Sequence, residues 1–354
     1  MRRFLLTSRK PLQQRALSLG LVCALGGTLH FGARGVAMAQ FYPIGKPGVP
    51  WGPTERTEWL AKQSIKRSYH EEVLSKIEKL RQAGDFEVFQ YGALSYDTEK
   101  YPLFALKTPG FGKTGKPVVL VTGGVHGYET SGVQGALRFL ETEAKEYADE
   151  FDILVAPCVS PWGYETINRW NPNAVDPNRS FKKDSDSEEA AAIMKLVSGI
   201  ESPVLLHMDL HETTDTDESE FRPARAARDG KETYVPDAVP DGFYTVGDTE
   251  NPQTEFQAAI IASVRKVTHI APPDAKGCII GEPVAQEGVI NYPIKSLGLC
   301  SGVTGAKFVS TTEVYPDSPK VTDAVCNEGQ VAAVTGALEF VKQGLRAKVA
   351  KVQA

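Results

Sequence analysis

The chain has 354 residues, of which 42% are hydrophobic and 23% are charged, so it is long enough for one large α/β domain or two modest ones. A mean hydropathy of -0.24, with no 18-residue apolar run after residue 40, excludes a stable membrane span in that part. The formal net charge is -5, yet the first 39 residues carry six basic and no acidic residues. The remainder is therefore strongly acidic, which argues against nucleic acid as a partner.

Residues 1–39 are typical of a secretory signal peptide. A basic stretch up to Arg15 precedes an apolar run over 16–29, which is followed by Ala37-Met38-Ala39, a small-residue cleavage site. A membrane anchor is disfavoured because this apolar run is short and interrupted by three glycines. We therefore expect cleavage after Ala39 and an exported protein, periplasmic or secreted, by either the Sec or the twin-arginine route.

Four cysteines remain after residue 39, namely Cys158, Cys278, Cys300 and Cys326. An exported chain can keep disulfides, and four cysteines allow three pairings between which the sequence does not choose. Two interpretations stay open: buried free thiols, or one bridge among the last three cysteines. No Cys-x-x-Cys pair is present, which argues against a cysteine zinc site.

The first predicted elements follow the signal peptide. Residues 40–83 are expected to form an N-terminal arm, rich in Pro and Gly, and one amphipathic helix over 57–82. Residues 86–91 and 101–106 are apolar runs on either side of a polar turn, which predicts a β-hairpin.

Strands and helices then alternate. A buried-type strand over 117–121 enters a glycine-rich turn and a helix over 131–148. The same order recurs with a strand over 152–157, a helix over 187–197 and a strand over 203–210. This alternation predicts an α/β sheet with helices on both faces and its chemistry at the strand ends.

The later part of the chain has weaker patterns. Residues 215–251 are rich in charge, Gly and Pro, which predicts a surface excursion. Its acidic run of Asp215, Asp217, Glu218 and Glu220 is interpreted as a solvated face, with selection of basic side chains as the alternative. A strand over 308–315 and a closing helix over about 329–350 complete the prediction.

Two segments carry residue types suited to a metal. His126 and Glu129 form a His-x-x-Glu pair between a strand and a helix, where an imidazole and a carboxylate can reach one cation. His207, Asp209 and His211 share one face of a strand, so either histidine is a candidate third ligand. His211, at the strand end, is better placed, because an earlier strand histidine is more often an interior residue.

A third segment, residues 171–181, places Arg179 beside amide side chains in a proline-containing loop. Guanidinium groups bind carboxylates with two parallel hydrogen bonds, so Arg179 is suited to an acidic substrate end. The alternative is a loop arginine paired with Asp176. Arg169 is a candidate for a second cation near the metal.

These motifs follow a recognisable order: His-x-x-Glu after a strand, the run over 161–165, an Asp-x-Asn-Arg loop, an Asp-Leu-His strand end and a late Thr-Glu strand. In that order the chain resembles the zinc carboxypeptidase superfamily, including its succinylglutamate desuccinylase and aspartoacylase branch. The resemblance implies a catalytic domain over 84–354, with a three-layer α/β/α fold and a mixed, mostly parallel central sheet.

The resemblance also implies roles for individual residues. One zinc ion per chain would be bound by His126, Glu129 and His211, with Glu313 as the catalytic base. The remaining assignments are Asn178 and Arg179 for the substrate carboxylate, Arg169 for the developing oxyanion, and Tyr292 as a capping tyrosine. A turn residue is the alternative for Tyr292, and Glu282 and Glu287 are expected to lie in a loop.

The resemblance implies a zinc-dependent hydrolase whose substrate has a free carboxylate. We expect a metallocarboxypeptidase that cleaves peptides, because export favours a peptide substrate. The alternative is an N-acyl amino acid deacylase, which is favoured by the short spacing between Glu129 and His211 and by the Asp-Leu-His-Glu-Thr strand end.

Overall fold

The computed structural model describes residues 42–353, so the predicted signal peptide lies outside the described residues. The central element is an eight-stranded sheet in the order β1-β2-β4-β3-β5-β10-β6-β9. Its strands are β1 Glu87–Ala93, β2 Pro102–Lys107, β3 Val118–Gly123, β4 Asp152–Ala156, β5 Val204–Glu212, β6 Tyr244–Asp248, β9 Val289–Tyr292 and β10 Phe308–Val314. Strands β4, β3, β5 and β10 are mutually parallel. Strand β2 pairs antiparallel with β1 and β4, and β6 is antiparallel to β10 but parallel to β9.

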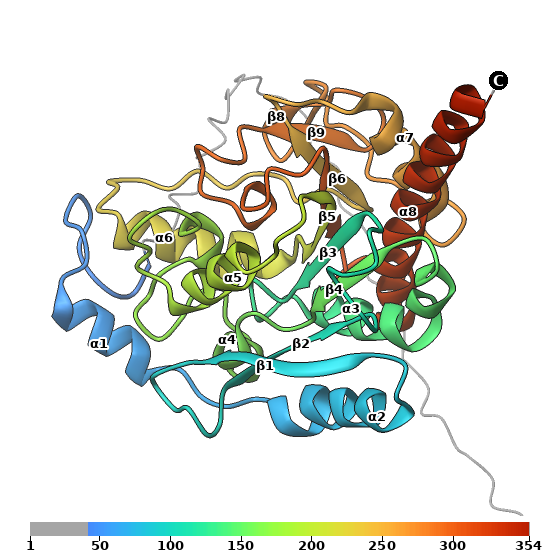
Figure 1. Cartoon of the computed structure of the whole chain (residues 1–354). Coiled ribbons are helices and arrows are strands. Elements are labelled where there is room, and N and C mark those ends of the chain that lie inside the picture. The colour runs from blue at the N-terminus through green and yellow to red at the C-terminus, as the bar shows by residue number, and fades with distance from the viewer. Residues whose placement is uncertain (1–41, 354) are drawn as a thin grey trace, which may run out of the picture. The chain divides into compact units, whose positions relative to one another are not determined.

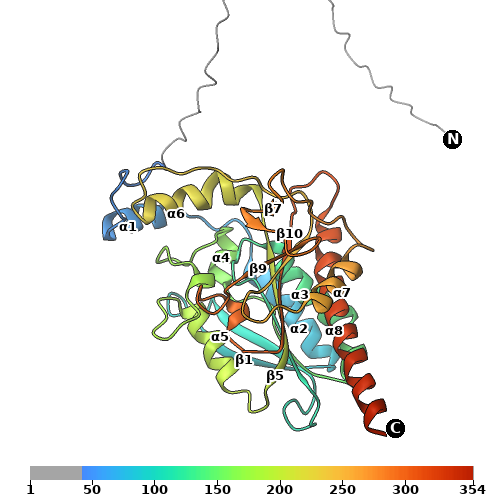
Figure 2. The same cartoon turned by 90° about the horizontal axis from the view of Figure 1, so that it is seen from above.

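Helices cover both faces of this sheet (Figures 1 and 2). On one face lie α2 (Ser75–Ala83), α3 (Thr130–Thr142), α7 (Thr254–Val264) and α8 (Asp323–Gln353), and on the other lies α5 (Glu188–Ser198). Successive residues of β3 point to opposite faces, so Val119 and Val121 join the larger core while Leu120 packs with Ile193 of α5. The predicted three-layer α/β/α fold with a mixed sheet is confirmed.

The predicted helix over 57–82 is broken into two. Helix α1 spans Pro53–Ala61, and a π-helical turn over His70–Leu74 leads into α2. Between them the backbone N–H groups of Lys66 and Arg67 donate to the carbonyl of Glu165, at 2.8 and 3.2 Å. This tertiary pairing replaces the helical hydrogen bonds, and Ile65, counted among the apolar residues of the predicted helix, is 61% exposed.

The predicted surface excursion over 215–251 contains an interior strand of the sheet. It includes a π-helical turn over Asp217–Phe221 and α6 (Arg222–Arg228), followed by β6, which is buried along its whole length between β10 and β9. The prediction is therefore wrong for 244–248. Five strand residues were hidden by the Gly, Pro and charged residues around them, and α7 and β9 were missed as well.

The other differences are small. Helix α3 ends at Thr142 and is followed by a short 3-10 helix over Ala144–Tyr147, and α8 begins six residues before the predicted start. The Glu282 segment forms only a two-residue pairing of β7 (Cys278–Ile279) with β8 (Glu282–Pro283).

The four cysteines after residue 39 are free thiols, and three of them, Cys158, Cys300 and Cys326, are buried. Burial raises the pKa of Cys158 to about 12, so this thiol stays protonated. Within residues 42–353, no helix is long and apolar enough to cross a membrane.

Candidate metal centre and cavity

Three strand ends meet at one edge of the sheet because β3, β5 and β10 are parallel neighbours. Gly123 at the end of β3 is paired with Leu210 of β5, and His211 is paired with Glu313 of β10. The turn after β3 therefore brings His126 and Glu129 to the same edge as His211 and Glu313. Residues almost 190 positions apart in the sequence share one site for this reason.

Two glycines, one in the turn after β3 and one at the start of α3, allow this segment to pack closely against its neighbours. A Cβ atom on Gly127 would lie 2.1 Å from the backbone nitrogen of Tyr164 in α4 (Pro161–Thr166). A Cβ atom on Gly132 would lie 2.4 Å from the carbonyl oxygen of Leu210. Any side chain at either position would displace the backbone that carries His126 and Glu129.

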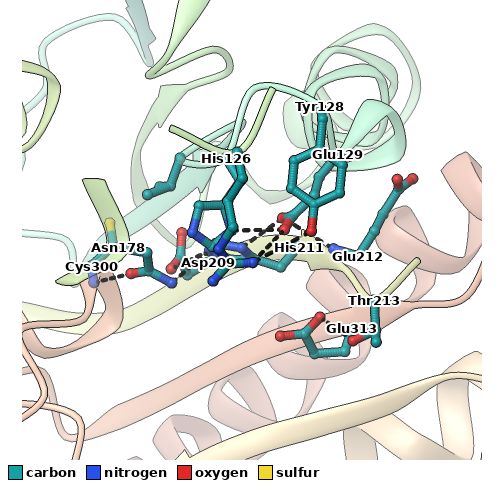
Figure 3. A network of polar contacts seen from close by, with 12 residues as sticks. His126, Tyr128, Glu129, Asn178, Asp209, His211, Glu212, Thr213, Cys300 and Glu313 are labelled. Atoms are coloured by element: carbon teal, nitrogen blue, oxygen red, sulfur yellow. Dashed lines mark hydrogen bonds and ion pairs between the residues drawn. The ribbon is translucent and has the colours of Figure 1, made fainter. Parts of the chain in front are cut away.

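His126, Glu129 and His211 form a buried cluster with their ligand atoms within 4.8 Å of one another. The Nδ1 atoms of His126 and His211 each lie 2.7 Å from a different carboxylate oxygen of Glu129. Figure 3 shows these three side chains pointing toward one another, with Glu313 below them in this view. The structure thus brings together the three residues predicted as metal ligands.

The second nitrogen of each imidazole contacts a further carboxylate. His126 Nε2 lies 3.0 Å from Asp176, and His211 Nε2 lies 2.9 Å from Asp209. A carboxylate behind a histidine fixes the orientation of the ring and the nitrogen that faces the metal. In this role Asp176 and Asp209 hold both Nδ1 atoms toward Glu129.

His207, the other candidate ligand, lies outside this cluster. Its Nε2 atom is 3.0 Å from the hydroxyl of Thr122, which in turn donates to Asp209 at 2.6 Å. Burial lowers the pKa of His207 to about 4, so the imidazole is neutral at pH 7. His207 also belongs to a second buried group with Asp209 and Cys300, within the core of the sheet.

The electrostatics of the cluster favour a cation. Burial opposes the ionisation of Glu129, but the two imidazoles outweigh it and hold the pKa of Glu129 below its ordinary value. Burial likewise opposes protonation of His211, but Asp209 and Glu129 raise its pKa well above the usual range. A metal ion that binds such a carboxylate and imidazole displaces the proton that they share, and this proton is released to solvent.

Two nitrogens and one carboxylate, each imidazole backed by a second carboxylate, are a donor set that fits zinc. Three protein ligands leave a coordination position open, as catalytic zinc sites require. His126 and Glu129 line a cavity of about 320 Å³, so the open position faces a space that can admit a ligand. This arrangement meets the structural requirements for zinc-assisted hydrolysis.

Glu313 lines the same cavity without belonging to the cluster. Its Oε2 atom accepts a hydrogen bond of 2.9 Å from Thr213, and the side chain is partly buried. Burial, together with the nearby charge of Glu129, raises the pKa of Glu313 to about 8. A carboxylate with a raised pKa is a better proton acceptor, which is the property a general base needs.

The residues predicted to bind substrate also line the cavity. Asn178 is held in place because its side-chain oxygen accepts a hydrogen bond from the backbone N–H of Cys300, at 2.8 Å. Arg179 donates to the backbone carbonyl of Asn178 at 2.6 Å, and Asp176 pairs with Arg169 and not with Arg179. Tyr292 reaches the cavity from the last position of β9.

Arg169 lies beside the candidate metal ligands. Its Nη1 atom is 4.0 Å from Glu129, while its other contacts are Asp176 at 3.0 Å and Asp217 at 3.2 Å. These carboxylates outweigh the effect of burial and raise the pKa of Arg169 well above its ordinary value. Arg169 is therefore a fixed positive charge at the edge of the site.

Several residues of the site were missed by sequence analysis. Asp217 is buried, and its two carboxylate oxygens share the hydrogen bond that the Tyr128 hydroxyl donates, so interpreting its acidic run as a solvated face is wrong for this residue. Glu212 accepts hydrogen bonds from the N–H groups of Thr130 and Ser131 and so anchors the start of α3. The Glu-Thr pair after His211 was the available signal for Glu212 and Thr213, whereas Asp217 gave none.

Comparisons with known proteins agree with this geometry. Residues 94–203 match the family model described as zinc carboxypeptidase. No curated protein matches the chain. The resemblance to the zinc carboxypeptidase superfamily is confirmed. The match covers the segment that carries His126, Glu129 and Arg179, whereas His211 and Glu313 come from the part of the fold beyond it.

Solved structures with the same fold include several carboxypeptidases. A metallo-carboxypeptidase from Burkholderia cenocepacia has a TM-score of 0.54 and 15% identity, with 77% of this chain and 69% of that chain covered. Bovine thrombin-activatable fibrinolysis inhibitor, in complex with tick carboxypeptidase inhibitor, has a TM-score of 0.52 and 15% identity, with coverages of 81% and 99%. A Pseudomonas aeruginosa metallo-carboxypeptidase in complex with (2-guanidinoethylmercapto)succinic acid has a TM-score of 0.52 and 15% identity, with coverages of 77% and 68%. The family match and this fold indicate a zinc-dependent hydrolase.

The metal centre predicts a specific pattern of metal loss. Purified protein lacking residues 1–39 is expected to contain close to one zinc per chain, and His126→Ala and His211→Ala to lose most of it. His207→Gln is the matched control and should keep its zinc, because His207 faces Thr122. Elemental analysis measures the zinc content of each variant. Full retention in both alanine variants would refute the assignment, and loss in His207→Gln alone would make His207 the third ligand.

Proposed function

We propose that the chain is an exported zinc-dependent carboxypeptidase that removes the C-terminal residue of a peptide. One observation carries this proposal: His126 and Glu129 of the candidate metal centre line the same cavity as Glu313 and Arg179. Hydrolysis of a terminal amide bond requires an activated water, a proton carrier and a group that recognises the free carboxylate. The cavity has a candidate residue for each of these requirements.

The first part of the mechanism concerns the proton. When bound by His126, Glu129 and His211, zinc would lower the pKa of a water molecule and polarise the scissile carbonyl. Glu313 takes one proton from the attacking water and later delivers it to the nitrogen of the leaving amine. Water is thereby added across the C–N bond, which gives a new carboxylate and a free amino acid.

The second part concerns the orientation of the substrate. Arg179 binds the terminal carboxylate through its guanidinium group, and Asn178 contributes an amide donor beside it. Arg169 supplies positive charge near Glu129, where negative charge develops on the carbonyl oxygen. Tyr292, which also lines the cavity, covers the bound residue. These contacts hold the scissile bond in reach of Glu313.

Replacing the proposed base tests the proton-transfer step. Glu313→Gln keeps the size of the side chain but removes the proton acceptor, so turnover is expected to fall by a factor on the order of 10² to 10⁴. Zinc content should be unchanged, since Glu313 is not in the ligand cluster. Turnover and elemental analysis are measured on the same preparation. Near-normal turnover with intact zinc would assign the base role to another carboxylate.

Substrate pairs that differ only at the C-terminus test the carboxylate clamp. A free-acid peptide is expected to be cleaved faster than its C-terminal amide, by a factor of about 10² or more, because the amide leaves Arg179 unpaired. Arg179→Lys should lower activity on the free acid roughly tenfold or more, since an ammonium group does not form the planar pair of hydrogen bonds. Mass spectrometry of the products gives both rates.

Equal cleavage of acid and amide by the wild-type enzyme would contradict the clamp and favour an internal amide hydrolase. N-acyl amino acids form a second set of substrates in the same assay. If the enzyme hydrolyses these compounds but no peptide, the proposed function becomes that of an N-acyl amino acid deacylase, whose substrate has the same free carboxylate.

Export is tested on the full chain expressed in a bacterial host. The mature protein is expected in the periplasm or medium with its N-terminus at Gln40, because residues 1–39 have the order of a signal peptide. Ala39→Arg should block processing by placing a large charged residue at the cleavage site. Intact-mass measurement of each fraction reads the result, and an unprocessed wild-type chain confined to the cytoplasm would refute export.

A further inference from the structure

Arginines are concentrated in the cavity next to the metal centre. Four of them line it, namely Arg169, Arg179, Arg222 and Arg225. Two have carboxylate partners: Arg169 pairs with Asp176 and Asp217, and Arg222 pairs with Glu218 at 2.5 Å. Their charges are therefore neutralised within the protein.

The other two arginines have no such partner. Arg179 donates to a backbone carbonyl, and neither it nor Arg225 forms an ion pair with any residue of 42–353. The carboxylates that line the cavity all have other partners. Glu129 contacts the imidazoles, Glu212 accepts from the start of α3, and Glu313 accepts from Thr213. Asp217 pairs with Arg169, and Asp237 pairs with Arg222. The cavity therefore presents two guanidinium groups without a carboxylate partner.

Helix α6 is held firmly, so the position of the backbone that carries Arg225 is defined. Ala224 and Ala227 on the same helix are buried against Trp51 and Trp170, and Arg228 stacks on Trp170 at 4.5 Å. The backbone N–H of Trp51 also donates to the backbone carbonyl of Arg228, at 2.9 Å. A charged side chain on a rigid element is a suitable specificity contact.

Arg225 lies in a positive environment. The Arg225 side chain is exposed to solvent and lines the cavity. Desolvation, and then the positive charges of Arg169 and Arg179, lower its pKa, while Asp176 acts in the opposite direction. An anionic group of a ligand would relieve this repulsion and form charge-assisted hydrogen bonds. Because a single carboxylate at Arg179 leaves Arg225 unpaired, the cavity has the charge for a ligand with two anionic groups.

We propose that Arg225 binds the acidic side chain of the C-terminal residue of the substrate, while Arg179 binds the α-carboxylate of that residue. The enzyme would then release glutamate or aspartate in preference to neutral amino acids. This inference rests on the carboxypeptidase function proposed above. It assigns a specificity role to α6, which lies outside the segment matched by the family model.

The test uses two peptides that differ only in a C-terminal Glu or Gln, which have nearly the same shape. The wild-type enzyme is expected to have a kcat/KM for the Glu peptide about ten- to a hundredfold higher. Arg225→Gln should reduce this ratio at least tenfold, and Arg225→Lys, which keeps the charge, should retain part of it. Arg265→Gln is the matched control, since Arg265 is an exposed arginine outside the cavity and should leave the ratio unchanged.

The outcomes separate this inference from the function on which it rests. Equal rates on the two peptides would overturn the inference and leave the carboxypeptidase standing. A preference for Glu that survives in Arg225→Gln would overturn the assignment to Arg225. Cleavage of neither peptide, nor of any other free-acid peptide, would refute the carboxypeptidase function together with the inference. An equal fall in the ratio for Arg265→Gln would show a general effect of net charge and would also overturn the assignment.

Discussion

The parallel pairing of β3, β5 and β10 is the constraint on which the site depends. In a parallel sheet the carboxyl ends of the strands lie at one edge, and here that edge receives a turn with His126 and Glu129, a strand end with His211, and Glu313 on the next strand. A shift of one residue between β5 and β10 would move Glu313 to the other face of the sheet. The pairing thus fixes which side chains meet before any of them interact.

The edge is further stabilised by charge. Four buried carboxylates and the two buried imidazoles of the candidate ligands are linked by short polar contacts. The carboxylates are those of Glu129, Asp176, Asp209 and Glu212. Buried charges are tolerated only when they are paired, and here each carboxylate contacts an imidazole, a guanidinium or a backbone N–H. Glu212 ties the end of β5 to the start of α3, so the same network that prepares the metal site also holds two elements together.

The sequence allowed the fold class and the residues near the metal to be predicted, because their signals are local. His-x-x-Glu after a buried strand and a histidine at a strand end are short patterns, and the strand and helix order identified the α/β architecture. The broken helix at 62–68 and the buried strand β6 depend on tertiary contacts: Arg67 reaches α4, and β6 lies between two strands that are distant in sequence. Asp217 looked like one charge among several, since only the fold places it beside Tyr128 and Arg169.

The residues proposed for catalysis and those proposed for specificity lie in different parts of the fold. His211 and Glu313 lie at the ends of strands that are paired on both sides, and His126 and Glu129 lie in the turn that follows the central strand β3. Arg179 lies on a loop, Tyr292 ends the edge strand β9, and Arg225 lies on α6, inside the segment predicted as a surface excursion. Such peripheral elements can change without disturbing the sheet, so selectivity for the leaving residue can differ among proteins that share one metal centre. The unpaired charge at Arg225 is therefore a property of this chain, and not a requirement of the fold.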